Sequence, residues 1–88
     1  MMIMQEYLIK EYIKKLNIDD IINFAKKKNI DLSYNDATIL YTYAKKYYQE
    51  FLNGNEESII KELKSKLSPN TFREAYKLYL KYKIKYLN

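Results

Sequence analysis

The chain has 88 residues, enough for one domain with a single core, and its Lys and Arg outnumber its Asp and Glu by sixteen to eleven. Cys, His and Trp are absent, which excludes disulfides, thiolate metal sites and the commonest nucleophile and general base of enzymes. The net charge of +5 favours acidic partners without identifying one.

Lys, Ile, Tyr and Asn supply just over half of the residues. These four types share A/T-rich codons, so a bias in gene composition explains their excess as well as a functional surface does. Apolar residues recur at helical spacing throughout, and no stretch alternates with period two between turn residues. The sequence therefore predicts an all-α single compact domain, residues 1–88, of about five helices.

The first two predicted helices cover residues 3–16 and 20–28. Asn17 ends the first, since Asn tolerates the left-handed conformation of a C-cap. Asp19 is the predicted N-cap of the second, whose acidic start and Lys-rich end suit the helix dipole, and Asn29 stops it. The apolar positions of the first helix are Leu8, Ile9, Tyr12, Ile13 and Leu16.

The strongest periodic signal lies between residues 34 and 52 and predicts a central third helix. Ser33 is its predicted N-cap, and Asp36 follows at the spacing of a capping box, with Asp in place of Glu. Gly54 helps to end the helix because glycine adopts positive φ without strain. The apolar positions are Ala37, Leu40, Tyr41, Ala44, Tyr47, Tyr48 and Phe51.

The fourth and fifth predicted helices cover residues 56–67 and 69–87. Asn55 caps the fourth, whose first turn contains two glutamates. The pair Ser68-Pro69 marks the start of the fifth, with Ser as N-cap and Pro at the first helical position. We expect the third and fifth helices to be central to the domain.

The order of these signals over residues 18–88 resembles that of the DUF2624 (YqfT-like) family of uncharacterised small proteins from Bacillus-related bacteria. The resemblance implies a cytoplasmic bacterial protein, and it transfers no activity and no catalytic residue. It rests on four short stretches: Lys26-Lys27-Lys28-Asn29-Ile30, Leu52-Asn53-Gly54-Asn55, Leu63-Lys64-Ser65-Lys66-Leu67 and Ser68-Pro69-Asn70-Thr71.

The sequence predicts no catalytic, cofactor-binding or metal-ligating residue, and hence a protein that is not an enzyme and has no small-molecule substrate. The carboxylate pairs Asp19-Asp20 and Glu56-Glu57 fall at predicted helix starts, where capping explains them better than metal or acid–base chemistry does. A single glycine cannot form a phosphate-binding loop. Without a secretory signal or a long apolar run, we expect a cytoplasmic protein that does not contact membranes.

Residues 20–52 have the lengths of a helix-turn-helix unit, which would read DNA through the start of its second helix. Asp36 would then face the phosphates, and no cation follows it before Lys45. Plain helix packing is the alternative interpretation of this unit. The residues that would read bases are Tyr34, Asn35, Thr38, Ile39 and Thr42.

A basic stripe on the fifth helix is the best candidate for nucleic-acid binding. Its four cations recur every four residues and repel one another at this spacing, which a phosphate backbone or an acidic protein would relieve. The alternative is a solvated face whose last cations suit the helix dipole. The stripe consists of Arg73, Lys77, Lys81 and Lys85, with tyrosines expected near it for stacking.

Apolar residues occupy most of the rest of the fifth helix, an arc broader than docking on one face requires. The third helix shows a smaller surplus opposite its main apolar face. These surpluses predict a non-catalytic protein-interaction or regulatory module, which binds another protein or itself as a homodimer; nucleic-acid binding is the alternative. The predicted contact residues are Ile39, Tyr43, Leu78 and Tyr82.

Overall fold

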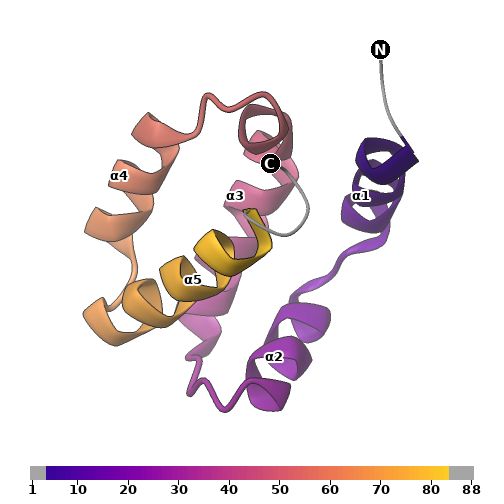
Figure 1. Cartoon of the computed structure of the whole chain (residues 1–88). Helices are drawn as coiled ribbons and strands as arrows, with labels where there is room; N and C mark the ends of the chain where they lie inside the picture. Colours follow the sequence, from indigo (N-terminus) through magenta and orange to yellow (C-terminus); the bar gives the residue numbers. More distant parts are fainter. Residues whose placement is uncertain (1–3, 84–88) are drawn as a thin grey trace.

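The structure is a computed structural model that describes residues 4–83, and these residues form five helices without a strand (Figure 1). The prediction of an all-α single domain is confirmed. The helices are α1 (Met4–Lys15), α2 (Ile18–Lys27), α3 (Tyr34–Leu52), α4 (Glu57–Lys66) and α5 (Pro69–Tyr82). None of them, over the residues described, combines the length and apolar character that a bilayer crossing requires.

The longest helix, α3, lies against α1, α2 and α4, and α4 also packs on α5. Figure 1 shows α1 at one edge of the molecule and α4 at the other, with α3 between them. The fifth helix reaches α3 through large side chains, since the rings of Phe51 and Tyr79 meet edge to face with centroids 5.5 Å apart. Helices α3 and α5 thus connect all the elements of the domain.

The helix ends follow some of the predicted polar signals and contradict others. Asn17, predicted as a left-handed C-cap of the first helix, is instead extended, with φ of −128°, and is the N-cap of α2. Ser33 Oγ accepts a hydrogen bond from the Asp36 N–H at 3.1 Å, which confirms Ser33 as N-cap. The prediction of Asp19 as N-cap of α2 is wrong, because Asn17 and Asp20 form a capping box. The Asp20 carboxylate reaches the cap N–H only from the third helical position, so α2 begins at residue 18, not 20.

The positive backbone angles lie at the two predicted stops. Asn29 has φ of 60° after α2, and Gly54 has φ of 79° after α3. The fourth helix begins at Glu57 and ends at Lys66, one residue inside the predicted range at each end, and its N-cap is Glu56 rather than the predicted Asn55. The predicted fifth helix extends to residue 87, and its last four positions lie outside the residues described.

Asp36 is the polar tie between the starts of α3 and α5. Its side chain is only 4% exposed and accepts hydrogen bonds from the Ser68 backbone N–H at 3.3 Å and from Ser68 Oγ at 2.6 Å. Burial raises the pKa of Asp36, but the hydrogen bonds from Ser68 and Thr71 outweigh it, so the net pKa lies below its ordinary value. The hydroxyl of Ser68, the residue predicted to cap α5, therefore donates to Asp36 of α3 and makes no capping hydrogen bond to α5.

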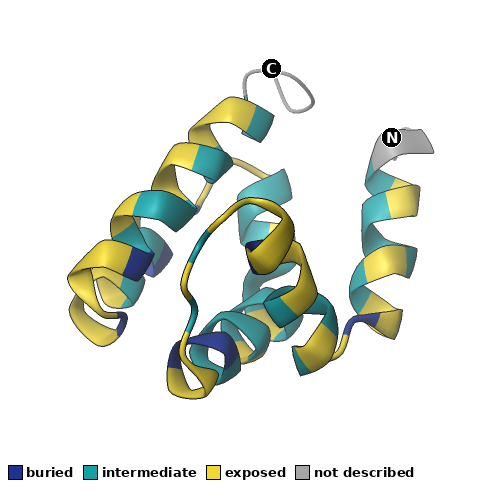
Figure 2. Cartoon of the chain, turned by 90° about the horizontal axis from the view of Figure 1, so that it is seen from below, coloured by how far each residue is buried: buried dark blue, intermediate teal, exposed yellow. Residues whose placement is uncertain are grey.

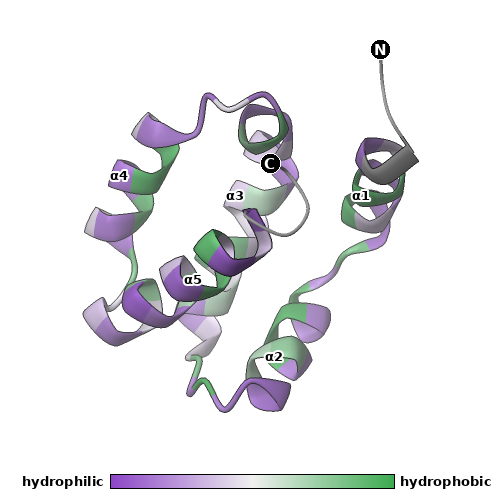
Figure 3. Ribbon diagram, viewed as in Figure 1, coloured by the Kyte–Doolittle hydropathy of each residue, from purple (hydrophilic) through white to green (hydrophobic). Residues whose placement is uncertain are grey.

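The core of the domain is small and contains few fully covered side chains. Among the residues described, the buried apolar ones are Leu16, Ala25, Ala37, Ile59 and Leu67, and no large side chain is completely enclosed. Figure 2 accordingly shows intermediate burial over most of the helical surface that faces inward. Figure 3 shows α4 turning its hydrophobic side toward α3 and its hydrophilic side outward. Half-buried aliphatic and aromatic side chains together therefore make up most of the packing.

Replacing Asp36 by Ala is expected to lower the free energy of unfolding at neutral pH by about 1.5–3 kcal/mol, because hydrogen bonds to a buried carboxylate are lost. The pKa of Asp36 is lower in the folded protein than its ordinary 3.8. The stabilisation is therefore full above that pH and is lost as pH falls through the folded-state pKa. Urea titrations at several pH values measure this, with the exposed Asp31→Ala as control; equal losses in both variants would contradict it.

Candidate functional site

An apolar groove with a volume of about 330 Å³ lies between α1, α3, α4 and α5. Each of these helices contributes apolar or aromatic side chains to it, and almost no polar atom lines it. Ala44 and Ala75 are the smallest side chains among its lining residues. Representative lining residues of the apolar groove are Ile9, Ile13, Tyr43, Tyr48, Leu63 and Phe72.

Polar contacts hold two of the walls of the apolar groove in place. The Tyr43 hydroxyl donates a hydrogen bond to Glu62 Oε1 of α4 at 3.2 Å, and Glu62 is exposed, so this contact lies where the groove meets solvent. On the α1 side, Lys45 Nζ donates to the carbonyls of Ile13 and Lys14 at 2.6 and 2.9 Å. An ammonium at the C-terminus of a helix suits the helix dipole, so Lys45 fastens α1 to α3.

A second cavity of about 290 Å³ lies between α2, α3 and α5. Leu40, Ala75 and Tyr79 line both this cavity and the apolar groove, so a single layer of side chains separates them. Its other walls include Ile21 and Phe24 of α2. The helices are thus held apart on both sides of α5.

The structure distributes the four predicted contact residues over different sides of the molecule. Tyr43 lines the apolar groove, and Leu78 and Tyr82 line the second cavity. Ile39 lines neither, and all four are half-buried rather than exposed. Their role in binding stays a prediction, and they do not form one continuous surface.

The most exposed apolar surface that sequence reasoning missed lies on α1. Leu8 and Tyr12 were expected to share the inward face with Ile9 and Ile13, but they are 58% and 60% exposed. Only Ile9, Ile13 and Leu16 turn inward, because these three share one side of the helix. Tyr7 adds a third exposed apolar side chain to the outer face.

The described part of the basic stripe is exposed but not free of acidic neighbours. Arg73, Lys77 and Lys81 all face solvent, whereas Lys85 lies outside the residues described. Glu74 of the same helix forms an ion pair with Lys77 at 3.7 Å, so an acid within the helix already relieves part of the repulsion in the stripe. Tyr76, one of the tyrosines of this helix, stacks on Phe72 with the ring centroids 5.6 Å apart.

The predicted DNA-reading unit presents only part of its candidate residues. Tyr34, Asn35 and Thr42 are exposed at α3, but the Thr38 hydroxyl donates to the Tyr34 carbonyl at 2.9 Å. Asp36, which would have faced the phosphates, is buried against α5. At the start of α3, Asp36 therefore bonds to the start of α5 instead of facing solvent.

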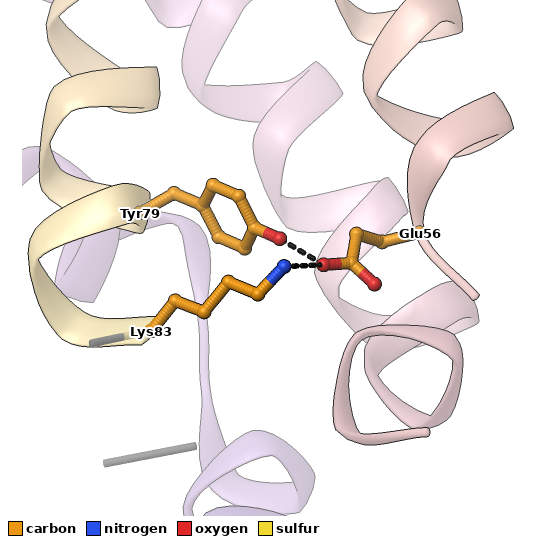
Figure 4. Close-up of polar contacts among 3 residues, drawn as sticks. All are labelled: Glu56, Tyr79 and Lys83. Carbon is orange, nitrogen blue, oxygen red and sulfur yellow. Dashed lines mark hydrogen bonds and ion pairs between the residues drawn. The ribbon is translucent and has the colours of Figure 1, made fainter. Parts of the chain in front are cut away.

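A buried carboxylate joins the start of α4 to the end of α5 (Figure 4). Glu56 is 5% exposed, and its Oε2 accepts hydrogen bonds from the Tyr79 hydroxyl and, at 3.0 Å, from Lys83 Nζ. Burial raises the pKa of Glu56, but the bonds from Tyr79 and Lys83 outweigh it and leave the pKa below its ordinary value. Burial and the Glu56 carboxylate together raise the pKa of Tyr79.

Sequence reasoning assigned Glu56 only to the start of α4. Its partners lie on a different helix, and nothing in the local pattern around residue 56 indicates them. The spacing of Tyr79 and Lys83, one helical turn apart, shows that both can reach one group, but it does not identify that group. Within the described residues, no three acidic side chains gather as metal ligands would.

Comparisons with known proteins add no family to this geometry: no family model, no curated protein and no solved structure matches the chain. The resemblance to the DUF2624 family therefore stays a prediction.

Replacing Glu56 by Gln is expected to lower the free energy of unfolding by about 1–3 kcal/mol at neutral pH, because a buried charge-assisted pair of hydrogen bonds is lost. The ordinary pKa of this group is 4.5, and the folded value lies below it. The wild-type advantage is therefore full above that pH and vanishes as pH falls through the folded-state pKa.

Thermal unfolding followed by circular dichroism across this pH range checks the expectation. The control is Glu57→Gln, because Glu57 is exposed and its ion pair with Lys61 contributes little. A loss in Glu56→Gln no larger than that in the control would contradict the assignment.

Proposed function

We propose that the protein is a non-catalytic binding module whose apolar groove holds the apolar face of a helix from a partner protein. The observation that carries this proposal is the groove itself, about 330 Å³ and lined by apolar and aromatic side chains of four helices. Folded cores normally leave few voids larger than a water molecule. Apolar surface left open on this scale typically marks a binding site.

An amphipathic helix is the occupant that best suits the shape of this site. Helices dock in such grooves through apolar side chains spaced at i, i+3, i+4 and i+7, which fill an elongated apolar surface. Tyrosines such as Tyr43 and Tyr48 offer large apolar contact area at low conformational cost, as at many protein interfaces.

The charge of the chain indicates acidic residues beside the apolar face of the partner helix. The net charge is +5, and Lys46 lies at the Tyr43 side of the groove with its Nζ 5.1 Å from the centroid of the Tyr47 ring. Charges around an apolar centre determine partner choice and association rate more than affinity. The proposed partner is therefore an amphipathic helix with acidic flanks.

A synthetic peptide tests the proposal, with Leu at the apolar positions of one helical face and Glu on either side. We expect it to bind wild-type protein and to bind Ala44→Phe about tenfold more weakly, a loss of ~1.4 kcal/mol, because the new ring fills the groove. Isothermal calorimetry measures the affinity. The matched control is Gln49→Phe, which adds the same ring on an exposed position of α3.

Three results would contradict the proposal. They are equal binding by both Phe variants, tighter binding of a Lys-flanked version of the peptide, and no binding at all. Sedimentation velocity of the protein alone shows whether a second copy is the occupant instead. In that case self-association rises with concentration and is reduced in Ala44→Phe only.

The second candidate function, nucleic-acid binding, is supported by the three exposed cations Arg73, Lys77 and Lys81 on α5. Fluorescence anisotropy with duplex DNA and single-stranded RNA tests it at about 50 and 200 mM salt, where phosphate contacts weaken strongly with salt. We expect the signal to disappear when all three are changed to Gln. Binding that is independent of salt, or unchanged in this variant, would exclude the stripe.

A further inference from the structure

Among the residues described, side chains donate to one oxygen of the Glu56 carboxylate and not to the other. Tyr79 and Lys83 both donate to Oε2, whereas Oε1 is buried and has no donor in hydrogen-bond geometry among the residues described. Figure 4 shows the two donors converging on one oxygen and the other turned away from both. An unsatisfied buried carboxylate oxygen is costly, and a ligand that donates to it would remove that cost.

A pocket of about 390 Å³ adjoins this carboxylate and gives such a ligand room. Ile60, Tyr76 and Leu80 form apolar walls, and Glu56, Tyr79 and Lys83 line its polar side. Gly54 lies at its edge, and a side-chain carbon added there would meet no atom within 4 Å. The pocket is distinct from the apolar groove, although Tyr76 and Tyr79 contribute to both.

Lys83 shows which chemistry this site accepts. Its ammonium lies 3.0 Å from the carboxylate and 5.7 Å from the centroid of the Tyr79 ring, and its side chain remains 45% exposed. The site thus already binds a cation through a buried carboxylate and an aromatic ring. Its partial exposure allows Lys83 to leave without unfolding the helix.

A guanidinium matches the site better than an ammonium does. The planar fork of a guanidinium donates to both oxygens of a carboxylate at once and stacks on aromatic rings. It would therefore supply a donor to Oε1 that the ammonium of Lys83 does not. The other charges at the pocket are Glu57 and Lys61, which pair with each other at 3.7 Å and leave Glu56 as the available anion once Lys83 departs.

We propose that the pocket beside Glu56 and Tyr79 binds a guanidinium group, and that Lys83 occupies the site as an internal cation which this group displaces. The guanidinium belongs either to an arginine side chain of another protein or to a free small molecule. This inference goes beyond the proposed function and does not depend on the apolar groove.

The test follows methylguanidinium binding by NMR, using the amide of Gly54, the single glycine of the chain and a lining residue of the pocket. Removal of the internal competitor in Lys83→Ala should tighten binding about tenfold, if Lys83 holds the site about nine-tenths of the time. In the double variant that combines Lys83→Ala with Glu56→Gln, methylguanidinium binding should be abolished. Lys81→Ala, exposed on the same helix, should bind as the wild type does.

Matched probes separate this proposal from weak binding of any cation. Methylammonium should bind Lys83→Ala more weakly than methylguanidinium, and sodium chloride at equal ionic strength should not shift the Gly54 resonance. If Lys83→Ala does not fold, Lys83→Gln replaces it, because it keeps the stem and loses the charge. Agmatine and a blocked arginine amide then distinguish the two sources of the guanidinium. Tighter binding of agmatine identifies a free small molecule, and tighter binding of the blocked arginine amide identifies an arginine side chain of a protein.

The proposal is overturned if methylammonium binds as tightly as methylguanidinium, if binding survives Glu56→Gln, or if no probe moves the Gly54 resonance. None of these results bears on peptide binding in the apolar groove. Conversely, Ala44→Phe, which blocks the groove, should leave methylguanidinium binding unchanged.

Discussion

The arrangement of the helices depends on one constraint, the packing of many tyrosines in a very small domain. A tyrosine fills a core with its ring but needs water or a partner for its hydroxyl, so it rarely disappears completely from the surface. Tyr43 and Tyr79 meet this need with Glu62 and Glu56 on the neighbouring helix. Helices separated by rings of this size leave gaps between them, and the apolar groove and the second cavity are those gaps.

The two buried acids show how the protein joins its helices where apolar burial is limited. Asp36 and Glu56 both stand at or near a helix start, where a carboxylate is favoured by the helix dipole, and both bond to α5. A buried charge is stabilising only when donors surround it, and these acids find donors in hydroxyls as well as in an ammonium. The polar ties therefore determine where α5 lies, and the aromatic contacts fill the space beneath it.

The sequence predicted the helices well because their signals are local. Asn29, Gly54 and Pro69 act through their own backbone, Ser33 acts through a hydrogen bond to a backbone N–H three residues later, and the bounds of α3 agree at both ends. It predicted the site poorly because the contacts of Glu56, Lys45 and Asp36 join residues of different helices. Leu8 and Tyr12 illustrate the same limit: helical spacing shows which residues share a side, but on a helix with two apolar sides it does not show which one packs inward.

Hydrogen bonds to neighbouring helices hold α5 at both of its ends. Ser68 fixes its first turn to α3, and Tyr79 and Lys83 fix its last turn to the start of α4. A helix held in this way cannot tilt unless the contacts at one end are broken. Loss of the contacts with Glu56 would free the C-terminal end of α5. That end carries Leu78 and Tyr82, which line the second cavity. Tyr79, whose hydroxyl bonds to Glu56, also lines that cavity, so one ring takes part in the buried carboxylate contact and in the cavity wall.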